Sequence, residues 1–212
     1  MKEILKNIHL LKLGSVNAYL VDHGTLTLID TGNPGSEDKI IAYIRKIGKE
    51  PKDVENIIVT HLHTDHAGSA AALATMTGAN VSMHPVDAAL VKTGKSFRDQ
   101  VTVTPGIFNR FLFNAVIKRA PRVIPPFEVT SYLEDNTSLD IGKGFRVFHV
   151  PGHAQGQIAL LYEKTLFAAD TAGNLMGLAL APFYENLEQG KQSQNWPLLV
   201  LSQQFLDMVS QS

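Results

Sequence analysis

The chain has 212 residues, of which 44% are hydrophobic and 18% are charged, and its formal net charge at pH 7 is -1. This composition is typical of a single globular domain, and the balanced charge argues against nucleic-acid binding, which requires a strongly basic face. The absence of cysteine excludes disulfides, thiolate metal ligands and thiol nucleophiles.

The beginning of the chain lacks the features of a secretory signal. Polar and charged residues interrupt the apolar stretch at 4–13, and no small-residue cleavage site follows it. No run of roughly eighteen or more apolar residues occurs, so the sequence predicts no membrane-spanning helix. We therefore expect a cytoplasmic protein that acts on a small molecule without a nucleic-acid or membrane partner. The sequence does not indicate an oligomeric state.

Strand and helix patterns alternate in the first part of the chain. Residues 17–21 and 26–29 are apolar runs separated by a Gly-containing turn, which predicts a β-hairpin. Apolar residues at helical spacing then predict a helix that begins near Ser36 and ends at Gly48. Residues 57–59 are wholly apolar, as expected for a strand that is buried on both faces.

The rest of the chain again combines helices with strands. An Ala-rich segment at 67–77 predicts a helix, and apolar runs predict strands at 81–83, 145–150, 158–162 and 166–169. Two halves that each contain strands and helices favour a layered α/β structure.

Two segments depart from this pattern within the single domain that we expect over residues 1–212. Residues 85–126 mix apolar residues at helical spacing with basic residues, and we expect them to form an insertion that covers the substrate. The alternative is a helix that packs on the core with a solvated basic face. Residues 194–212 form an atypical tail that fits poorly with the rest of the chain.

The most informative motif is His61-Leu62-His63-Thr64-Asp65-His66, which lies between the predicted buried strand and the Ala-rich helix. Residues two apart in an extended stretch point to the same side, so the first two histidines can face one point. The following Asp-His pair begins the helix and can face a neighbouring point. Imidazole and carboxylate groups are the ligands that a divalent metal accepts when no thiolate is present. This concentration of histidine favours a metal site over a surface loop.

Two other strand ends carry candidate ligands. The segment Pro151-Gly152-His153 places a histidine in a turn, and Asp170 follows the last predicted strand. On its own, each residue would more often be a turn or cap residue. Because loops at the ends of strands can converge at one edge of a sheet, the three segments together predict one site.

These segments resemble the metallo-β-lactamase superfamily. The matching pieces are Ile29-Asp30-Thr31-Gly32, the histidine-rich motif, Pro151-Gly152-His153 and Asp170-Thr171, in the order and approximate spacing of the family. The histidine-rich motif is highly specific, whereas the other three are individually weak. The resemblance implies an α/β protein with a four-layer αββα sandwich, whose site lies along one edge of the two sheets.

The resemblance also implies a role for each residue. The implied metal ligands are His61, His63 and His153 for a first ion, Asp65 and His66 for a second ion, and Asp170 between the two. Asp30 would orient these ligands without binding metal, and its alternative role is to cap a turn. Zinc is the expected metal, and iron or manganese would accept the same ligands.

The function that the resemblance implies is hydrolysis of a small ester, thioester or lactone by a metal-bound hydroxide. Asp65 and Asp170 would position this nucleophile. Hydrolysis of a β-lactam is compatible with the resemblance but is not indicated. A non-haem iron oxygenase with the same ligands is an alternative. The Gly-x-Ser-x-Gly motif is absent, which argues against a serine-dependent α/β-hydrolase.

The chain departs from the family pattern at its end. The family usually has one more ligand histidine in a Gly-His-Gly turn, but this chain has no histidine after His153. Read one base earlier, Asn195-Trp196-Pro197 gives Leu-Ala, and with chosen codons Leu206-Asp207-Met208-Val209 gives Gly-His-Gly. A frameshift near Ser193 is therefore a hypothesis that the coding DNA would test. We expect a well-formed first site and a weakly occupied second one, and a catalytically impaired product is a further alternative.

Overall fold

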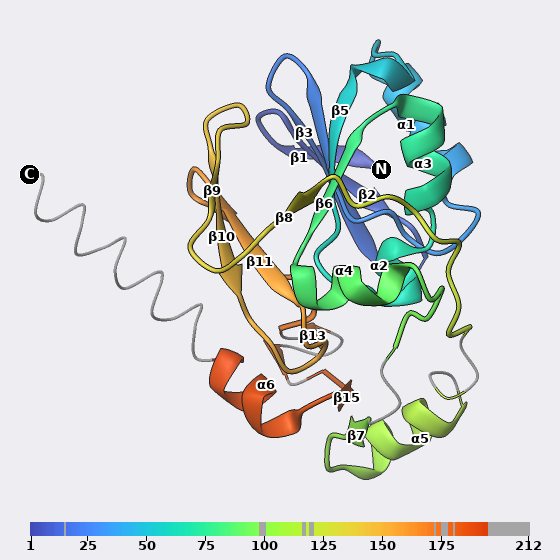
Figure 1. The fold of residues 1–212 in the computed structure, drawn as a ribbon, viewed down its shortest axis with the longest axis vertical. Coiled ribbons are helices and arrows are strands. Elements are labelled where there is room, and N and C mark those ends of the chain that lie inside the picture. Colours follow the sequence, from blue (N-terminus) through green and yellow to red (C-terminus); the bar gives the residue numbers. More distant parts are fainter. Residues whose placement is uncertain are drawn as a thin grey trace, which may run out of the picture.

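The computed structural model describes residues 1–14, 16–97, 101–115, 118, 121–171, 173–174, 178–179 and 181–194 (Figure 1). The predicted atypical tail lies outside the described residues except for its first position. Within the described part of the chain, no helix combines the length and the apolar character that crossing a membrane requires.

A mixed sheet forms the first layer and, among the described residues, contains seven strands. Their order is β1 (Lys2–Leu5), β2 (Ile8–Lys12), β3 (Asn17–Asp22), β4 (Leu26–Ile29), β5 (Val54–Ile58), β6 (Asn80–Met83) and β8 (Ser131–Tyr132). The strands from β1 to β4 are antiparallel, whereas β4, β5, β6 and β8 run parallel. The pairing of β3 with β4 confirms the predicted hairpin. The edge strand β1 is exposed along its length and was not predicted, because it lacks the alternation of a half-buried strand.

A second, antiparallel sheet faces the first. Its described strands are β9 (Ser138–Leu139), β10 (Phe145–His149), β11 (Ile158–Tyr162) and β12 (Thr165–Phe167), in the order β12-β11-β10-β9. The last three confirm the strands predicted at 145–150, 158–162 and 166–169. In β10, Phe145 and Val147 point into the core between the sheets, and Phe148 belongs to a small cluster on the opposite face.

The two sheets pack together through apolar side chains. The core between them includes, from the first sheet, Ile8, Val21, Ile29 and Ile58 and, from the second sheet, Phe145, Val147, Ile158 and Leu160. In β5, Ile58 belongs to this core, whereas Ile57 belongs to the core on the helix side. This confirms the prediction of a strand that is buried on both faces.

Helices cover the other face of the first sheet (Figure 1). They are α1 (Glu37–Lys46) and α3 (Ala70–Thr77), which contribute Ile40, Ile44 and Leu73 to the core on that side. The first helix has acidic residues in its first turn and basic residues in its last, and these charges stabilise it by interacting with the helix dipole. The predicted Ala-rich helix is divided into α2 (Thr64–Ala67) and α3.

The short helix η1 (Pro51–Asp53) leads into β5 at the end of the strand away from the site. The remaining elements lie around the end of the sheets where the site forms. They are α4 (Pro85–Val91), β7 (Thr102–Val103), α5 (Ile107–Ala115), η3 (Ala169–Thr171), β13 (Gly173–Asn174), β14 (Leu178–Ala179), β15 (Phe183–Tyr184) and α6 (Leu187–Gln194). Ala88 and Val91 of α4 belong to the main core, so the first helix of segment 85–126 packs on the sheet. In contrast, β7 pairs with β15 and α5 lies beside it. A substrate-covering role for the segment stays a prediction.

Two stacked histidines connect α4 to the second sheet. His84 caps α4, its Nδ1 accepting a hydrogen bond from the Val86 N–H at 3.2 Å. Its ring stacks on His149 at the end of β10, with 3.9 Å between ring centroids. Burial and the neighbouring His149 lower the pKa of His84 to about 4, although Asp87 and Asp135 oppose the shift.

We expect the free energy of unfolding to decrease as the pH falls from about 6.5 to about 4. In this range the unfolded chain protonates His84 but the folded protein does not, so unfolding takes up a proton and acid favours it. The variant His84→Asn keeps a cap acceptor without this titration and should show a flatter decline. Urea unfolding at several pH values measures the difference, and an unchanged slope in the variant would assign the decline to other groups.

Candidate metal centre

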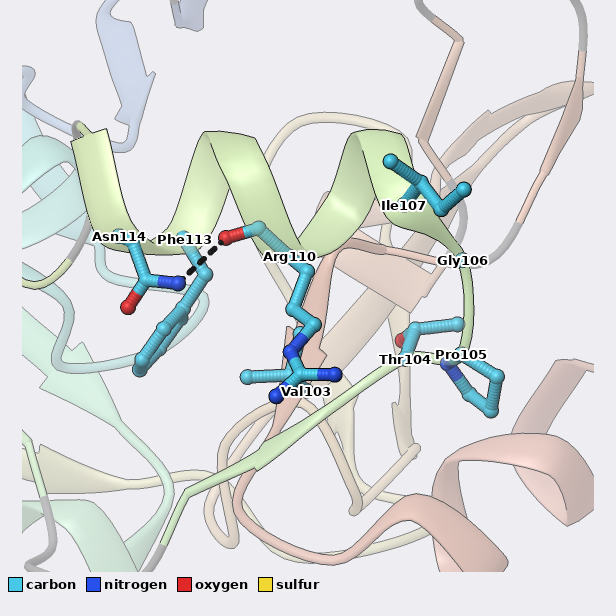
Figure 2. Close-up of a pocket in the computed structure, with 8 residues that line it drawn as sticks. All are labelled: Val103, Thr104, Pro105, Gly106, Ile107, Arg110, Phe113 and Asn114. Carbon is cyan, nitrogen blue, oxygen red and sulfur yellow. Dashed lines mark hydrogen bonds between the residues drawn. The ribbon is translucent and has the colours of Figure 1, made fainter.

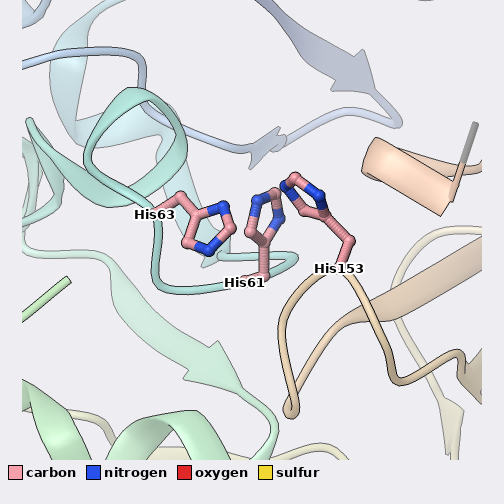
Figure 3. A group of neighbouring side chains, drawn as sticks. All are labelled: His61, His63 and His153. Atoms are coloured by element: carbon pink, nitrogen blue, oxygen red, sulfur yellow. The ribbon is translucent and has the colours of Figure 1, made fainter. Parts of the chain in front are cut away.

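Histidines and an aspartate from three loops meet at one edge of the two sheets. His61 and His63 lie between β5 and α2, and His153 lies between β10 and β11. Figure 3 shows their three rings gathered from these two loops. Among the described residues, two sets of candidate ligand atoms each lie within 4.8 Å of one another. One set is His61, His63 and His153, and the other is His61, His66 and Asp170.

The backbone explains why the loops take these conformations. His63 is extended, with φ -61° and ψ 147°, and its carbonyl accepts hydrogen bonds from the N–H groups of His66 and Ala67 in α2. The strand-to-helix turn therefore projects its histidines before the helix begins. In the second loop Gly152 has φ 138°, and a Cβ at this position would collide with the backbone of Gly190. Only glycine fits immediately before His153.

The four imidazole rings are buried and close together. Their side chains belong to residues that are at most 3% exposed, namely His61, His63, His66 and His153. The ring centroids of His61 and His66 are 4.0 Å apart, and those of His63 and His153 are 4.5 Å apart. The side chain of Asp170 is 40% exposed. The cluster is thus enclosed by protein on the histidine side and open to solvent at the carboxylate.

Hydrogen bonds determine which nitrogen of His153 and His66 carries the proton in the neutral ring. His153 Nδ1 lies 2.9 Å from the Phe183 carbonyl oxygen, which can only accept, so Nδ1 donates. His66 Nδ1 lies 2.8 Å from Asp30 Oδ2 and donates to this carboxylate. In the neutral form, both rings therefore direct an Nε2 lone pair into the cluster.

The same assignment follows for His61. Its Nδ1 lies 3.0 Å from Thr60 Oγ1. The hydroxyl has one proton, which it donates to Asp30 Oδ2 at 2.9 Å, so Oγ1 accepts from His61. His61 Nε2 therefore also presents a lone pair, and Asp30 controls two rings at once.

These Nε2 atoms are the observation that fits a metal ion. No described residue makes a hydrogen bond of good geometry to the buried Nε2 atoms of His61, His66 and His153, although those of His66 and His153 face the Asp170 carboxylate at 3.5 Å and 3.4 Å. Leaving a buried polar atom unpaired costs about 1–3 kcal/mol. Neutral imidazole lone pairs beside a carboxylate are the donors that zinc, iron and manganese accept. The residues present therefore suit a divalent cation.

The pKa values of His61 and His66 are shifted in opposite directions. Burial and the neighbouring His66 and His63 hold the pKa of His61 well below its ordinary value. Burial opposes a charge on His66, but Asp170 and Asp30 outweigh it and raise the pKa of His66 well above its ordinary value. Burial likewise opposes ionisation of Asp170, but His66 outweighs it, so the pKa of Asp170 lies well below its usual range. At pH 7 without a metal ion, His61 is therefore neutral, Asp170 is ionised and His66 is protonated, so a metal ion that bound His66 Nε2 would displace a proton.

The two remaining predicted site residues lie at the margin. Asp65 is half-buried and belongs to neither set of clustered ligand atoms among the described residues, so its role as a ligand stays a prediction. Asp30 is 4% exposed and lies behind the cluster, where it contacts Thr60 and His66. These contacts support an orienting role for Asp30.

An aromatic wall beside the histidines was not predicted residue by residue. We use this name for Phe97, Phe113 and Phe183. Phe97 stacks on His63 with 4.1 Å between ring centroids, and the ring centroids of Phe183 and His153 are 4.8 Å apart. The ring centroids of Phe113 and Phe183 are 6.1 Å apart. Phe183 reaches the site because β15 pairs with β7, and periodicity cannot reveal a pairing between such distant segments.

A cavity of about 660 Å³ lies between β7 and α5 (Figure 2). It is lined by Val103, Thr104, Pro105, Gly106, Ile107, Arg110, Phe113 and Asn114. Phe113 belongs to both the cavity and the aromatic wall, so the two features are contiguous. Arg110 adds a guanidinium group to a lining that is otherwise apolar or uncharged.

Comparisons with known proteins agree with this geometry. The family model described as "Metallo-beta-lactamase superfamily" matches residues 11–204. A probable metallo-hydrolase of Methanocaldococcus jannaschii, MJ0888, is 27% identical over 157 residues, covering 74% of this chain and 67% of that protein. The uncharacterised protein YobT of Bacillus subtilis is 38% identical over 170 residues, covering 78% of this chain and 66% of that protein.

A solved structure shares the fold. The metallo-β-lactamase of Cronobacter sakazakii with a HARLDQ motif has a TM-score of 0.61 and 22% identity, covering 74% of this chain and 57% of that chain. The chain thus spans about two thirds of the two relatives' length and a little over half of the solved protein's.

Proposed function

The chain belongs to the metallo-β-lactamase superfamily, and from this membership we propose that it is a metal-dependent hydrolase of a small ester, thioester or lactone. The fold class implied by the sequence resemblance is confirmed. One observation carries the proposal: buried imidazole Nε2 atoms from two loops converge beside a solvent-exposed carboxylate.

We assign the ligands in two groups. His61, His63 and His153 would hold one divalent ion. His66 and Asp65 would hold a second, and Asp170 would be a ligand of both. A bound zinc ion lowers the pKa of a water molecule from about 15.7 towards about 7 and polarises a carbonyl group. Iron and manganese accept the same ligands, and zinc is our first choice because imidazole ligands predominate.

The chain's own carboxylates would handle the proton. Asp170 is partly buried, with a side chain that is 40% exposed, and its lowered pKa keeps it ionised, so it would accept a hydrogen bond from the attacking water. It would take the water's proton as the new C–O bond forms and return it to the leaving alkoxide, thiolate or ring oxygen as the acyl bond breaks. Asp65 would position the nucleophile from the other side.

The cavity and the aromatic wall indicate the substrate class. An apolar acyl group can pack against Phe97 and Phe183 and extend past Phe113 into the cavity. Arg110 favours a substrate whose distal end is anionic. We therefore propose an acyl ester, thioester or lactone with an apolar arm.

The second group of ligands contains one imidazole against three in the first, which favours weaker occupation of the second site. Asp65, His66 and Asp170 would need water to complete the shell of an ion there. We propose one tightly bound ion and a second, weakly bound one, and an impaired enzyme is the corresponding alternative.

The experiment is a hydrolysis assay combined with metal analysis. We expect one tightly held equivalent of metal in the purified chain, loss of ester, thioester or lactone hydrolysis after chelation, and recovery with zinc. Substrates with longer apolar acyl arms should have lower KM. Hydrolysis that persists in metal-free protein would contradict the proposal. Oxygen consumption by an iron-loaded protein would favour the oxygenase.

A further inference from the structure

Asp87 lies outside both sets of candidate ligands but contacts two of the loops that carry them. It belongs to the first turn of α4 and is 1% exposed. Its Oδ2 accepts a hydrogen bond from the Leu62 N–H at 3.1 Å, and its Oδ1 accepts one from the Gly156 N–H at 2.9 Å. Leu62 lies between the two histidines of the first loop, and Gly156 lies three residues after His153.

The approach of Asp87 requires glycine in the second loop. A Cβ at Gly156 would lie 2.5 Å from Asp87 Cγ and 2.7 Å from its backbone nitrogen. Both distances are too short for any side chain, so Gly156 admits the carboxylate to its own N–H. The contact therefore depends on the identity of a residue in each segment, Asp87 in α4 and Gly156 in the loop after His153.

The first turn of α4 is itself attached to the same loop. The Asp87 N–H donates to the His84 carbonyl at 3.1 Å, and the His84 ring stacks on His149. His149 Nε2 donates to the Gln155 carbonyl at 2.8 Å. The helix turn that carries Asp87 therefore cannot shift without disturbing the loop.

We propose that Asp87 is a positioning residue that sets the separation between the two histidine loops. Its two oxygens belong to one rigid planar group, so neither backbone amide can move away without losing a hydrogen bond. The loops come from different sheets, and a hydrogen bond from the Ile158 N–H to the Thr60 carbonyl at 2.9 Å also joins them. The Asp87 carboxylate adds the contact that lies beside His61, His63 and His153 themselves. The inference rests on the proposed metal centre and adds a residue that would govern its metal affinity.

The test is Asp87→Asn. The amide has nearly the same shape, but its oxygen can accept from only one loop, and its NH2 then faces the other loop's N–H, donor against donor. We expect a folded protein whose dissociation constant for zinc is raised about 10- to 100-fold, as for other groups that orient metal ligands. The visible absorption spectrum of the cobalt-loaded variant should also differ from that of the wild type. Ile44→Val, which removes a core methyl group in α1, is the control and should leave both unchanged.

The possible results distinguish failure of the Asp87 proposal from failure of the proposed function. A variant with a lower urea midpoint but wild-type zinc affinity and cobalt spectrum would overturn the proposal, because Asp87 would then be purely structural. Amide hydrogen exchange in the wild type needs no variant to fold: we expect slow exchange at Leu62 and Gly156, and rates typical of an exposed loop would also overturn it. A wild-type chain that binds no zinc would instead refute the proposed function.

Discussion

Replacing His153 with alanine is expected to remove the tightly bound metal and to lower kcat/KM for hydrolysis by at least about 100-fold. His153 is the histidine that the second sheet contributes to the cluster, and its Nδ1 is fixed by the Phe183 carbonyl at 2.9 Å. Without it, the first set keeps His61 and His63, both from one loop. Two imidazoles leave a divalent ion largely held by water, so its affinity falls. Metal analysis after dialysis and steady-state kinetics measure both effects.

The control is His23→Ala. This histidine lies between β3 and β4, its Nε2 lies 2.9 Å from Thr27 Oγ1, and it belongs to neither set of clustered ligand atoms among the described residues. We expect a loss of stability of about 1 kcal/mol from the lost hydrogen bond, with metal content and activity retained. Equal loss of metal in both variants would show that general destabilisation, and not the ligand atom, determines binding.

The site was predictable where its determinants are local. His61 and His63 lie two residues apart at the end of a strand, and such spacing specifies a shared direction without knowledge of the rest of the fold. The apolar run before them likewise specified the buried strand β5. His153 could be included because it also follows a strand, and loops at strand ends converge in layered α/β folds.

The unpredicted parts depend on contacts between distant segments. The Ala-rich helix divides near Gly68, where a Cβ would collide with Pro34 and with the Thr64 carbonyl oxygen. Helix propensity, which describes single residues, cannot predict this close contact. Phe183 enters the site through the pairing of β15 with β7. Asp87 looks like an ordinary acidic residue in the first turn of a helix, and only the folded chain shows that it binds two backbone amides.

Asp30 was predicted as either an orienting residue or a turn cap, and its geometry supports both. It has φ 60°, a conformation that aspartate and asparagine tolerate better than most residues. Its Oδ1 accepts from the Thr60 N–H at 2.8 Å, and its Oδ2 accepts from both Thr60 Oγ1 and His66 Nδ1. One carboxylate thus holds the start of the histidine loop and sets the protonation of the ring that follows it.

Asp30→Asn is expected to weaken metal binding about 10- to 100-fold while changing the free energy of unfolding by only about 1 kcal/mol. The amide oxygen must remain opposite the Thr60 N–H, because the alternative orientation places two donors together. The NH2 group then faces His66 Nδ1, which has to accept, so the neutral ring carries its proton on Nε2. That proton blocks the lone pair that a metal would bind.

The measurement is nitrogen NMR of the histidine rings together with zinc titration. We expect the tautomer of His66 to change and the second, weaker site to lose more affinity than the first, since His66 belongs to it. Asp22→Asn provides a control of identical chemistry in the same sheet, where the carboxylate pairs with Lys49 at 3.0 Å and lies outside both sets of candidate ligands. A changed tautomer with unchanged zinc affinity would separate the ring's protonation from metal binding and remove His66 from the ligand set. Because the substitution leaves side-chain volume nearly unchanged, a loss of zinc in folded protein would arise from the lost carboxylate charge and from the protonation of the two rings that Asp30 controls, His66 directly and His61 through Thr60.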